Sequence, residues 1–187
     1  MPAAVPETAA MSFLSNRNYI ETTYGTGSFR RVREALLAGS WPEFPSVIVP
    51  NARYPTEMLI DLIDTARDVL GPEDFYERCG RGIVAYEMSV FMRFALRLTT
   101  PIGVLERATE AWRKVHSDGT WSWSGEEGAI MAILVGFPTK PGYCRFLSAY
   151  FKRLFELTGA RDVKIEHPEC SARGQRRCAY RATWHSK

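Results

Sequence analysis

The fold is decided by the stretch from Tyr143 to Trp184, which reads YCRFLSAYFKRLFELTGARDVKIEHPECSARGQRRCAYRATW. Its first part has apolar residues at helical spacing after Pro141, and Gly159 ends that period. Residues 162–167 and 176–184 then read as two strands joined by a tight turn that contains Gly174. A helix followed by a β-hairpin predicts an antiparallel sheet with a helix packed against it.

The segments before this stretch are mostly helical. Apolar residues recur at helical spacing over 28–38, 55–70 and 101–115, and over 73–98 as one broken helix or two, with Gly80 and Gly82 weakening the middle. Residues 120–124 and 129–137 read as a further pair of strands. We therefore predict the α+β class, a helical layer packed on a small antiparallel sheet, over residues 28–187. Residues 1–27, rich in Pro, Ala, Thr and Gly, are expected to form a flexible arm.

The composition excludes several classes of protein. A length of 187 residues with 45% hydrophobic residues suits one globular domain. The net charge of +3 is weak and its arginines are scattered, so we expect no nucleic-acid binding. No stretch approaches the roughly 18–20 apolar residues of a membrane span. The N-terminus does not resemble a signal peptide, which together with the cysteines favours a reducing, cytoplasmic location.

Thiols and an imidazole gather near the C-terminus. Between Cys144 and Cys178 lie three of the four cysteines and one of the three histidines. Zn²⁺ takes sulfur and nitrogen ligands tetrahedrally, and four protein ligands would make the site structural. The spacing alone leaves two alternatives open, namely packed apolar thiols and a disulfide between Cys170 and Cys178. The remaining cysteine, Cys79, is expected to be a core thiol.

The final 45 residues resemble the 4-vinyl reductase domain. The likeness is strongest to the sensor modules of sigma-54-dependent activators that respond to phenols and xylenes, a fold related to haem-NO-binding and TRAPP-type domains. It rests on Cys144, the run His167-Pro168-Glu169-Cys170, and Cys178. The resemblance implies a structural zinc, with His167 in place of the family's carboxylate. Because Glu166 and Glu169 flank His167, the fourth ligand is open between the histidine and a glutamate.

The same resemblance implies an aromatic pocket between the helices and the sheet. Trp123 matches a tryptophan that supports the effector ring, and Ala95 stands where the family reads phenol with a histidine. A more apolar ligand is therefore expected. The candidate pocket residues, which could equally be ordinary core or a dimer surface, are Phe91, Phe94, Trp112, Trp123, Tyr143 and Phe151.

We interpret the chain as a stand-alone sensory domain that binds a small apolar or aromatic ligand. A homodimer and a downstream signalling protein are the expected partners. The alternative is an adaptor or scaffold of the same fold without a small ligand. The sequence contains no common hydrolase motif or phosphate loop. It therefore predicts no enzyme, with an accessory role in tetrapyrrole or hydrocarbon chemistry as a minor alternative. Haem is not expected, because no histidine lies on a clearly apolar helix face.

Overall fold

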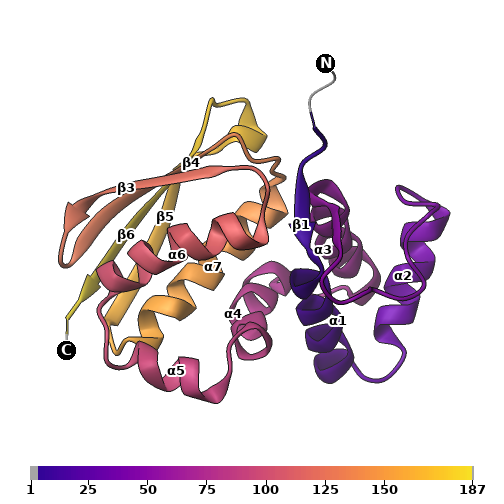
Figure 1. Cartoon of the computed structure of the whole chain (residues 1–187), viewed down its shortest axis with the longest axis horizontal. Helices are drawn as coiled ribbons and strands as arrows, with labels where there is room; N and C mark the ends of the chain where they lie inside the picture. The colour runs from indigo at the N-terminus through magenta and orange to yellow at the C-terminus, as the bar shows by residue number, and fades with distance from the viewer. Residues whose placement is uncertain (1–3, 187) are drawn as a thin grey trace.

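The structure is a computed structural model that describes residues 4–186. The chain runs from a helical half into a half that combines helices with a sheet (Figure 1). The helices are α1 (Ala10–Tyr24), α2 (Ser28–Ala38), α3 (Thr56–Leu70), α4 (Phe75–Glu87), α5 (Val90–Leu96), α6 (Pro101–Val115) and α7 (Pro141–Leu157), with the short 3-10 turn η1 (Ser171–Arg173). The strands are β1 (Glu7–Ala9), β2 (Arg53–Pro55), β3 (Thr120–Glu126), β4 (Ala129–Val135), β5 (Arg161–Glu169) and β6 (Cys178–His185). The predicted α+β class is confirmed.

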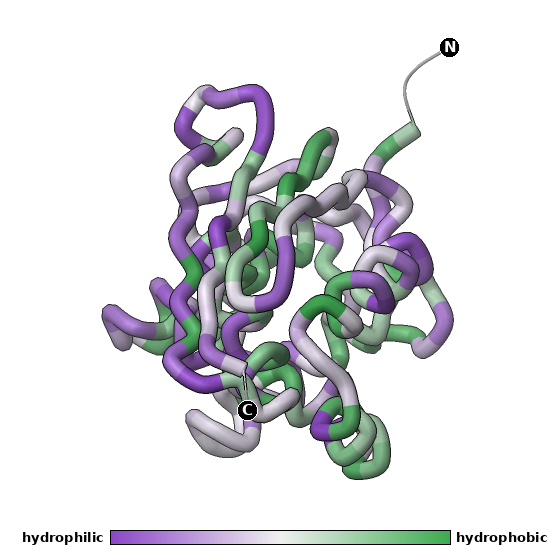
Figure 2. The backbone as a smooth tube through the Cα atoms, turned by 90° about the vertical axis from the view of Figure 1, so that its left-hand side faces the viewer, coloured by the Kyte–Doolittle hydropathy of each residue, from purple (hydrophilic) through white to green (hydrophobic). Residues whose placement is uncertain are grey.

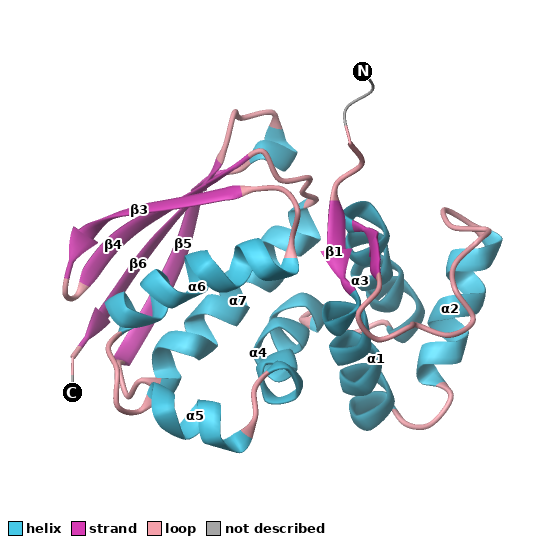
Figure 3. Ribbon diagram, viewed as in Figure 1, coloured by secondary structure: helices cyan, strands magenta, loops and turns pink. Residues whose placement is uncertain are grey.

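Four strands form one antiparallel sheet in the order β3-β4-β6-β5. Figure 3 shows α6 and α7 lying along one face of this sheet. Buried residues alternate along β4 and β6, which is the pattern of strands with one covered face. Figure 2, with the sheet side toward the viewer, shows short hydrophobic segments interrupting hydrophilic ones along the chain. One core cluster lies between the sheet and the helices that cover it, and a second, larger one extends among α1–α4 and α7.

The predicted arm over 1–27 is wrong for most of its length. β1 pairs with β2, and α1 buries Phe13 and Ile20 in the main core. The sequence did not predict α1, because the buried face of this helix carries polar as well as apolar side chains. Asn16 is 1% exposed and satisfies its amide by donating to the carbonyl of Ser12 at 2.8 Å. Residues 1–3 of the predicted arm lie outside the described range.

Two helices lie in the segment 73–98, as predicted, but Gly80 and Gly82 do not interrupt either of them. α4 runs unbroken through both glycines to Glu87, and the chain leaves the helix at Met88. The glycines instead allow close packing, since a Cβ on Gly82 would lie 2.3 Å from the ring of Tyr19. The segment therefore forms two helices, α4 and α5. The first helix ends before Met88, eight residues after Gly80.

No helix within residues 4–186 is both long enough and apolar enough to cross a bilayer.

Candidate metal centre and ligand cavity

Four ligand groups from the C-terminal stretch meet at one point. Cys144 lies in the first turn of α7, His167 on β5, Cys170 just before η1, and Cys178 at the start of β6. One ligand atom from each lies within 4.8 Å of all the others. Cys144 Sγ is 3.7 Å from Cys170 Sγ and 3.8 Å from Cys178 Sγ. Sulfurs bound tetrahedrally at the Zn–S distance of about 2.3 Å lie about 3.8 Å apart, so the spacing fits this ion.

His167 completes the cluster, and the neighbouring glutamates do not. The Nε2 atom of His167 is buried without a hydrogen-bond partner in the described part of the chain, and its ring stacks on Tyr180 at 4.3 Å. Glu169 is held by Arg177 through two hydrogen bonds of 2.7 and 2.8 Å, and Glu166 lies 3.6 Å from Arg181. A buried imidazole nitrogen without a partner is what a missing metal ligand bond leaves. The geometry therefore favours His167 over either carboxylate as the fourth group.

The cluster already favours a thiolate. A hydrogen bond from Cys144 lowers the pKa of Cys178, and hydrogen bonds with Ser171 add to that effect against the opposing influence of burial. Ser171 places its amide nitrogen 3.4 Å and its hydroxyl 3.1 Å from Cys178 Sγ. The same thiol pair raises the pKa of Cys144. Deprotonated sulfur is the form that binds metals, so the lowered pKa of Cys178 favours metal binding at this one sulfur.

A second feature is a cavity of about 340 Å³ enclosed by helices. Its walls come from α1, α3, α4, α5, α6 and α7, and most of the lining is apolar. Met11 and Met92 line it and are about half exposed (48% and 50%), so the cavity reaches the surface between α1 and α5. This volume lies within the ~300–1,000 Å³ range of small-molecule sites.

The structure brings half of the predicted pocket residues to this cavity. Trp112, Tyr143 and Phe151 line it. Trp123 does not; with Trp121 it borders a separate space of about 20 Å³ between α6, α7 and the sheet. Phe151 lies in the wall between the two spaces.

Phe91 and Phe94 are corrections to the predicted pocket. They are 78% and 56% exposed and lie on the outer side of α5. The residues of α5 that line the cavity are Met92, Ala95 and Leu96, at spacings of three and four. Six of the seven residues of α5 are apolar, so the sequence does not indicate which face of this short helix is buried.

Sequence reasoning missed the polar groups of the cavity, which include Glu87, Tyr150 and His116. Burial raises the pKa of Glu87 to about 7, and a hydrogen bond with Tyr150 partly opposes the rise. A usable signal was present, because Glu87 follows Ile83 and Val84 by four and three residues. It is therefore a charged residue on the apolar face of α4.

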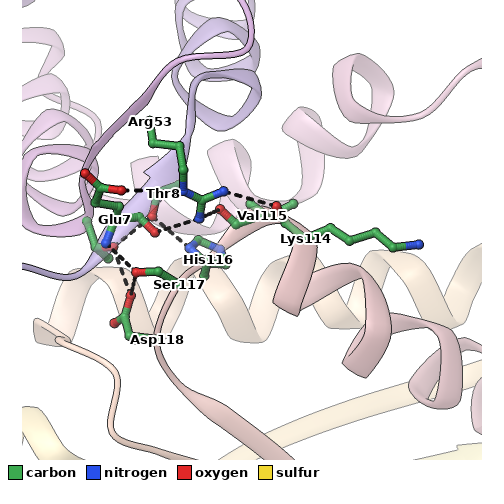
Figure 4. Close-up of polar contacts among 9 residues, drawn as sticks. Glu7, Thr8, Arg53, Lys114, Val115, His116, Ser117 and Asp118 are labelled. Atoms are coloured by element: carbon green, nitrogen blue, oxygen red, sulfur yellow. Dashed lines mark hydrogen bonds and ion pairs between the residues drawn. The ribbon is translucent and has the colours of Figure 1, made fainter. Parts of the chain in front are cut away.

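His116 fastens the N-terminal strand to the end of α6 (Figure 4). Its Nδ1 lies 2.8 Å from Thr8 Oγ1, and its ring packs 4.1 Å from that of Trp112. Burial, with the charge of Arg53, lowers the pKa of His116 to about 3, so the ring is neutral. Arg53 meanwhile donates to the carbonyls of Glu7, Lys114 and Val115. These contacts hold α1 and α6, two walls of the cavity, in a fixed relation.

No family model and no curated protein sequence matches the chain. Solved structures match it over nearly its full length. An H-NOX variant from K. algicida in the unliganded Fe(II) state is 11% identical with a TM-score of 0.68, covering 96% of this chain and 97% of that one. An S. oneidensis H-NOX variant in the Fe(II) state is 14% identical with a TM-score of 0.70 and the same coverage. The chain has an H-NOX-like fold. An oxygen-binding H-NOX domain related to soluble guanylate cyclases is also similar to this chain, with 14% identity and a TM-score of 0.63 over 95% of each chain.

This likeness confirms the expected relation to haem-NO-binding domains. At such identities the likeness establishes the H-NOX-like fold alone, and the chemistry of the site rests on the residues described above.

Proposed function

We propose that this chain is a sensory domain of the 4-vinyl reductase type that binds a small, largely apolar or aromatic molecule without transforming it. The observation that carries the proposal is the cavity of about 340 Å³ between α1, α3 and α4–α7, which is mostly apolar and open at the surface. A bound apolar molecule would remove the apolar lining of such an open cavity from contact with water, which is favourable. Homodimerisation and transfer of the signal to a partner remain predictions.

We further propose a structural zinc held by Cys144, His167, Cys170 and Cys178. The sulfur spacing and the unpartnered Nε2 of His167 support this assignment. Four protein ligands leave no open position, so the bound ion would stabilise the fold rather than activate water. The ligands come from α7 and from both strands of the last hairpin, so the centre would clamp the sheet to the helix. Cytoplasmic location accords with reduced thiols and remains part of the proposal.

The residues of the cavity do not fit a haem, although several fold neighbours are described in Fe(II) states. Haem iron is held by histidine, by methionine beside histidine, by cysteinate or by tyrosinate. His116 is the only histidine lining the cavity within residues 4–186, and its Nδ1 is engaged by Thr8 Oγ1 at 2.8 Å. Burial raises the pKa of Tyr143 and of Tyr150, which disfavours tyrosinate. The carboxylate of Glu87 would also repel haem propionates.

Ligand binding is tested on the full chain by isothermal titration with a panel of neutral apolar and aromatic compounds, with Trp112 emission as a second readout. Ala108, half-buried in α6, lines the cavity, so Ala108→Phe should fill part of it and weaken binding at least tenfold. Ala38→Phe at the exposed end of α2 is the matched control and should bind normally. Haemin added to the same protein should give no Soret band of a ligated iron. The proposal fails if no compound in the panel binds.

The adaptor remains a second candidate because of α5. The outer side of α5 is apolar and uncovered in the described chain. It carries Val90 (74% exposed), Phe91 and Phe94, and Leu98 (78% exposed) follows just after the helix. Exposed apolar surface of this kind often marks a protein-binding site. A sensor would bind a small molecule in the cavity, whereas an adaptor would bind a protein through the outer side of α5.

A further inference from the structure

Glu87 places a carboxylate in a cavity that is otherwise mostly apolar. The residue is the last of α4, is half-buried, and lines the cavity together with Met88, Met92 and Tyr150. The C-terminal end of a helix carries partial negative charge, which is an unfavourable place for a carboxylate. A carboxylate at this position does not stabilise the helix. Its presence therefore calls for an explanation in terms of the cavity.

The groups facing Glu87 do not compensate its charge. From α7, Tyr150 and Tyr143 approach it, and the pKa of Glu87 is affected by a hydrogen bond with Tyr150. Cys79, which lies on the same helix, is a neutral buried thiol, and burial and the charge of Glu87 both raise its pKa. From α6, His116 is neutral and Arg107 is exposed; from α1, the lining groups Ser12 and Asn16 are uncharged.

The lining residues from α3 and α5 are likewise uncharged: Leu59, Met92, Ala95 and Leu96. Within residues 4–186, no cationic side chain lowers the pKa of Glu87. A carboxylate removed from water without a cationic partner is unfavourable, and an ion pair inside the same space relieves the cost.

We propose that the cavity takes a small apolar amine, whose protonated amino group pairs with Glu87 while its apolar part packs against Trp112, Leu147 and Phe151. The inference rests on the proposed ligand binding and names the class of ligand. A neutral alcohol could donate one hydrogen bond to Glu87 but would leave the charge uncompensated. A carboxylic acid would be repelled, and a wholly apolar molecule would leave Glu87 facing hydrocarbon.

The pairing has a pH signature. Glu87 must be ionised to attract an ammonium group, and its pKa lies near 7, while an alkylamine stays protonated up to pH ~10. The affinity for an amine should therefore rise about tenfold between pH 6 and pH 8. The affinity for a neutral compound of the same shape should fall or stay level over that range, because ionised Glu87 has to be desolvated.

The experiment is isothermal titration of the full chain with phenethylamine, phenethyl alcohol and 3-phenylpropionate at pH 6 and pH 8. We expect the amine to bind at least tenfold more tightly than the alcohol at pH 8, with 3-phenylpropionate binding weakest. Glu87→Gln, which keeps the shape and removes the charge, should abolish this preference and its pH dependence while the alcohol still binds. Glu106→Gln, at an exposed position of the neighbouring helix α6, is the matched control and should leave both unchanged.

Two results overturn the inference. Equal binding of amine and alcohol by the wild-type chain at both pH values would refute the role of Glu87 and leave the ligand-binding function standing. Absence of binding by any of the three compounds, together with failure of the apolar panel, would refute both. The wild-type pH profile decides the matter even if the Glu87→Gln variant does not fold.

Discussion

The backbone of Gly80 in α4 lies so close to Phe146 in α7 that a Cβ on residue 80 would stand 2.2 Å from the Phe146 carbonyl oxygen. Such a distance is impossible without movement of backbone against backbone. The pair of helices it joins is among the most closely packed in the molecule and carries Glu87, Tyr143 and Tyr150. A glycine that looked like a helix breaker in the sequence is thus the contact that brings two cavity walls together.

Gly80→Ala should destabilise the protein by about 1–3 kcal/mol through overpacking. Helix propensity alone would give the opposite sign, since alanine is favoured over glycine by ~1 kcal/mol in a helix interior. Ala85→Gly, at an exposed position of the same helix, is the control and should cost only that propensity. Urea unfolding of the three proteins measures the difference. A Gly80→Ala protein as stable as wild type would show that the helices are free to separate.

Cys178→Ser should destabilise the whole domain and abolish stoichiometric zinc. Metal binding is coupled to folding, so loss of one ligand should lower the free energy of unfolding by on the order of 3 kcal/mol or more. Elemental analysis and thermal melts on protein purified without added zinc measure both effects. Cys79→Ser is the matched control, because that buried thiol contacts Asn16 and lies apart from the cluster. It should lose stability while keeping about one zinc per chain. Metal-free folded wild type with a Cys170–Cys178 disulfide would contradict the assignment.

Acid should weaken the fold through His116. Its pKa is lowered from 6.5 to about 3 in the folded chain, so the unfolded chain binds the proton more readily. The stability that neutral His116 contributes is present above about pH 6.5 and is lost progressively as pH falls toward 3. The full effect, reached only near pH 3, is on the order of 5 kcal/mol. Denaturant unfolding at pH 7, 5.5 and 4.5 should show a shallower decline for His116→Gln than for wild type. His185→Gln, exposed on β6, should follow wild type.

Phe91→Ser combined with Phe94→Ser should leave the melting temperature within a few degrees of wild type. Both side chains are mostly exposed, and surface changes of this kind usually alter stability by less than about 0.5 kcal/mol each. Titration with the apolar panel should also be unaffected, because neither side chain lines the cavity. Loss of self-association in analytical ultracentrifugation would instead identify the outer side of α5 as the surface through which the chain contacts a protein.

The final hairpin and the helix before it were predictable because their signals are local. The strand alternation, the turn glycine and Pro141 each act within a few residues, and the four ligand groups sit on those elements. The helix α1 was not predictable in the same way. Its buried face includes Ser12, Ser15 and Asn16, whose burial is made acceptable by contacts with distant parts of the chain such as Cys79.

The cavity was predictable only in part. Trp112, Tyr143 and Phe151 were expected because of the resemblance to the 4-vinyl reductase domain, and Trp112 and Phe151 also lie at helical spacing in the sequence. The orientation of α5 depends on how a short helix packs against α7, which no window of sequence contains. Glu87 was overlooked because a charged residue at the end of a helix is ordinarily solvated, and only the tertiary structure encloses it.

Tyr143 and Cys144 are consecutive residues in the first turn of α7, one in the cavity wall and the other in the metal centre. A displacement of that turn by a ligand therefore alters the geometry of the thiol cluster. Thermodynamic reciprocity then requires that the factor by which a ligand changes the affinity for metal equal the factor by which metal changes the affinity for ligand. With both proposed ligands bound, such a domain would respond to two solutes through a single equilibrium, and the concentration of metal would change its affinity for the small molecule.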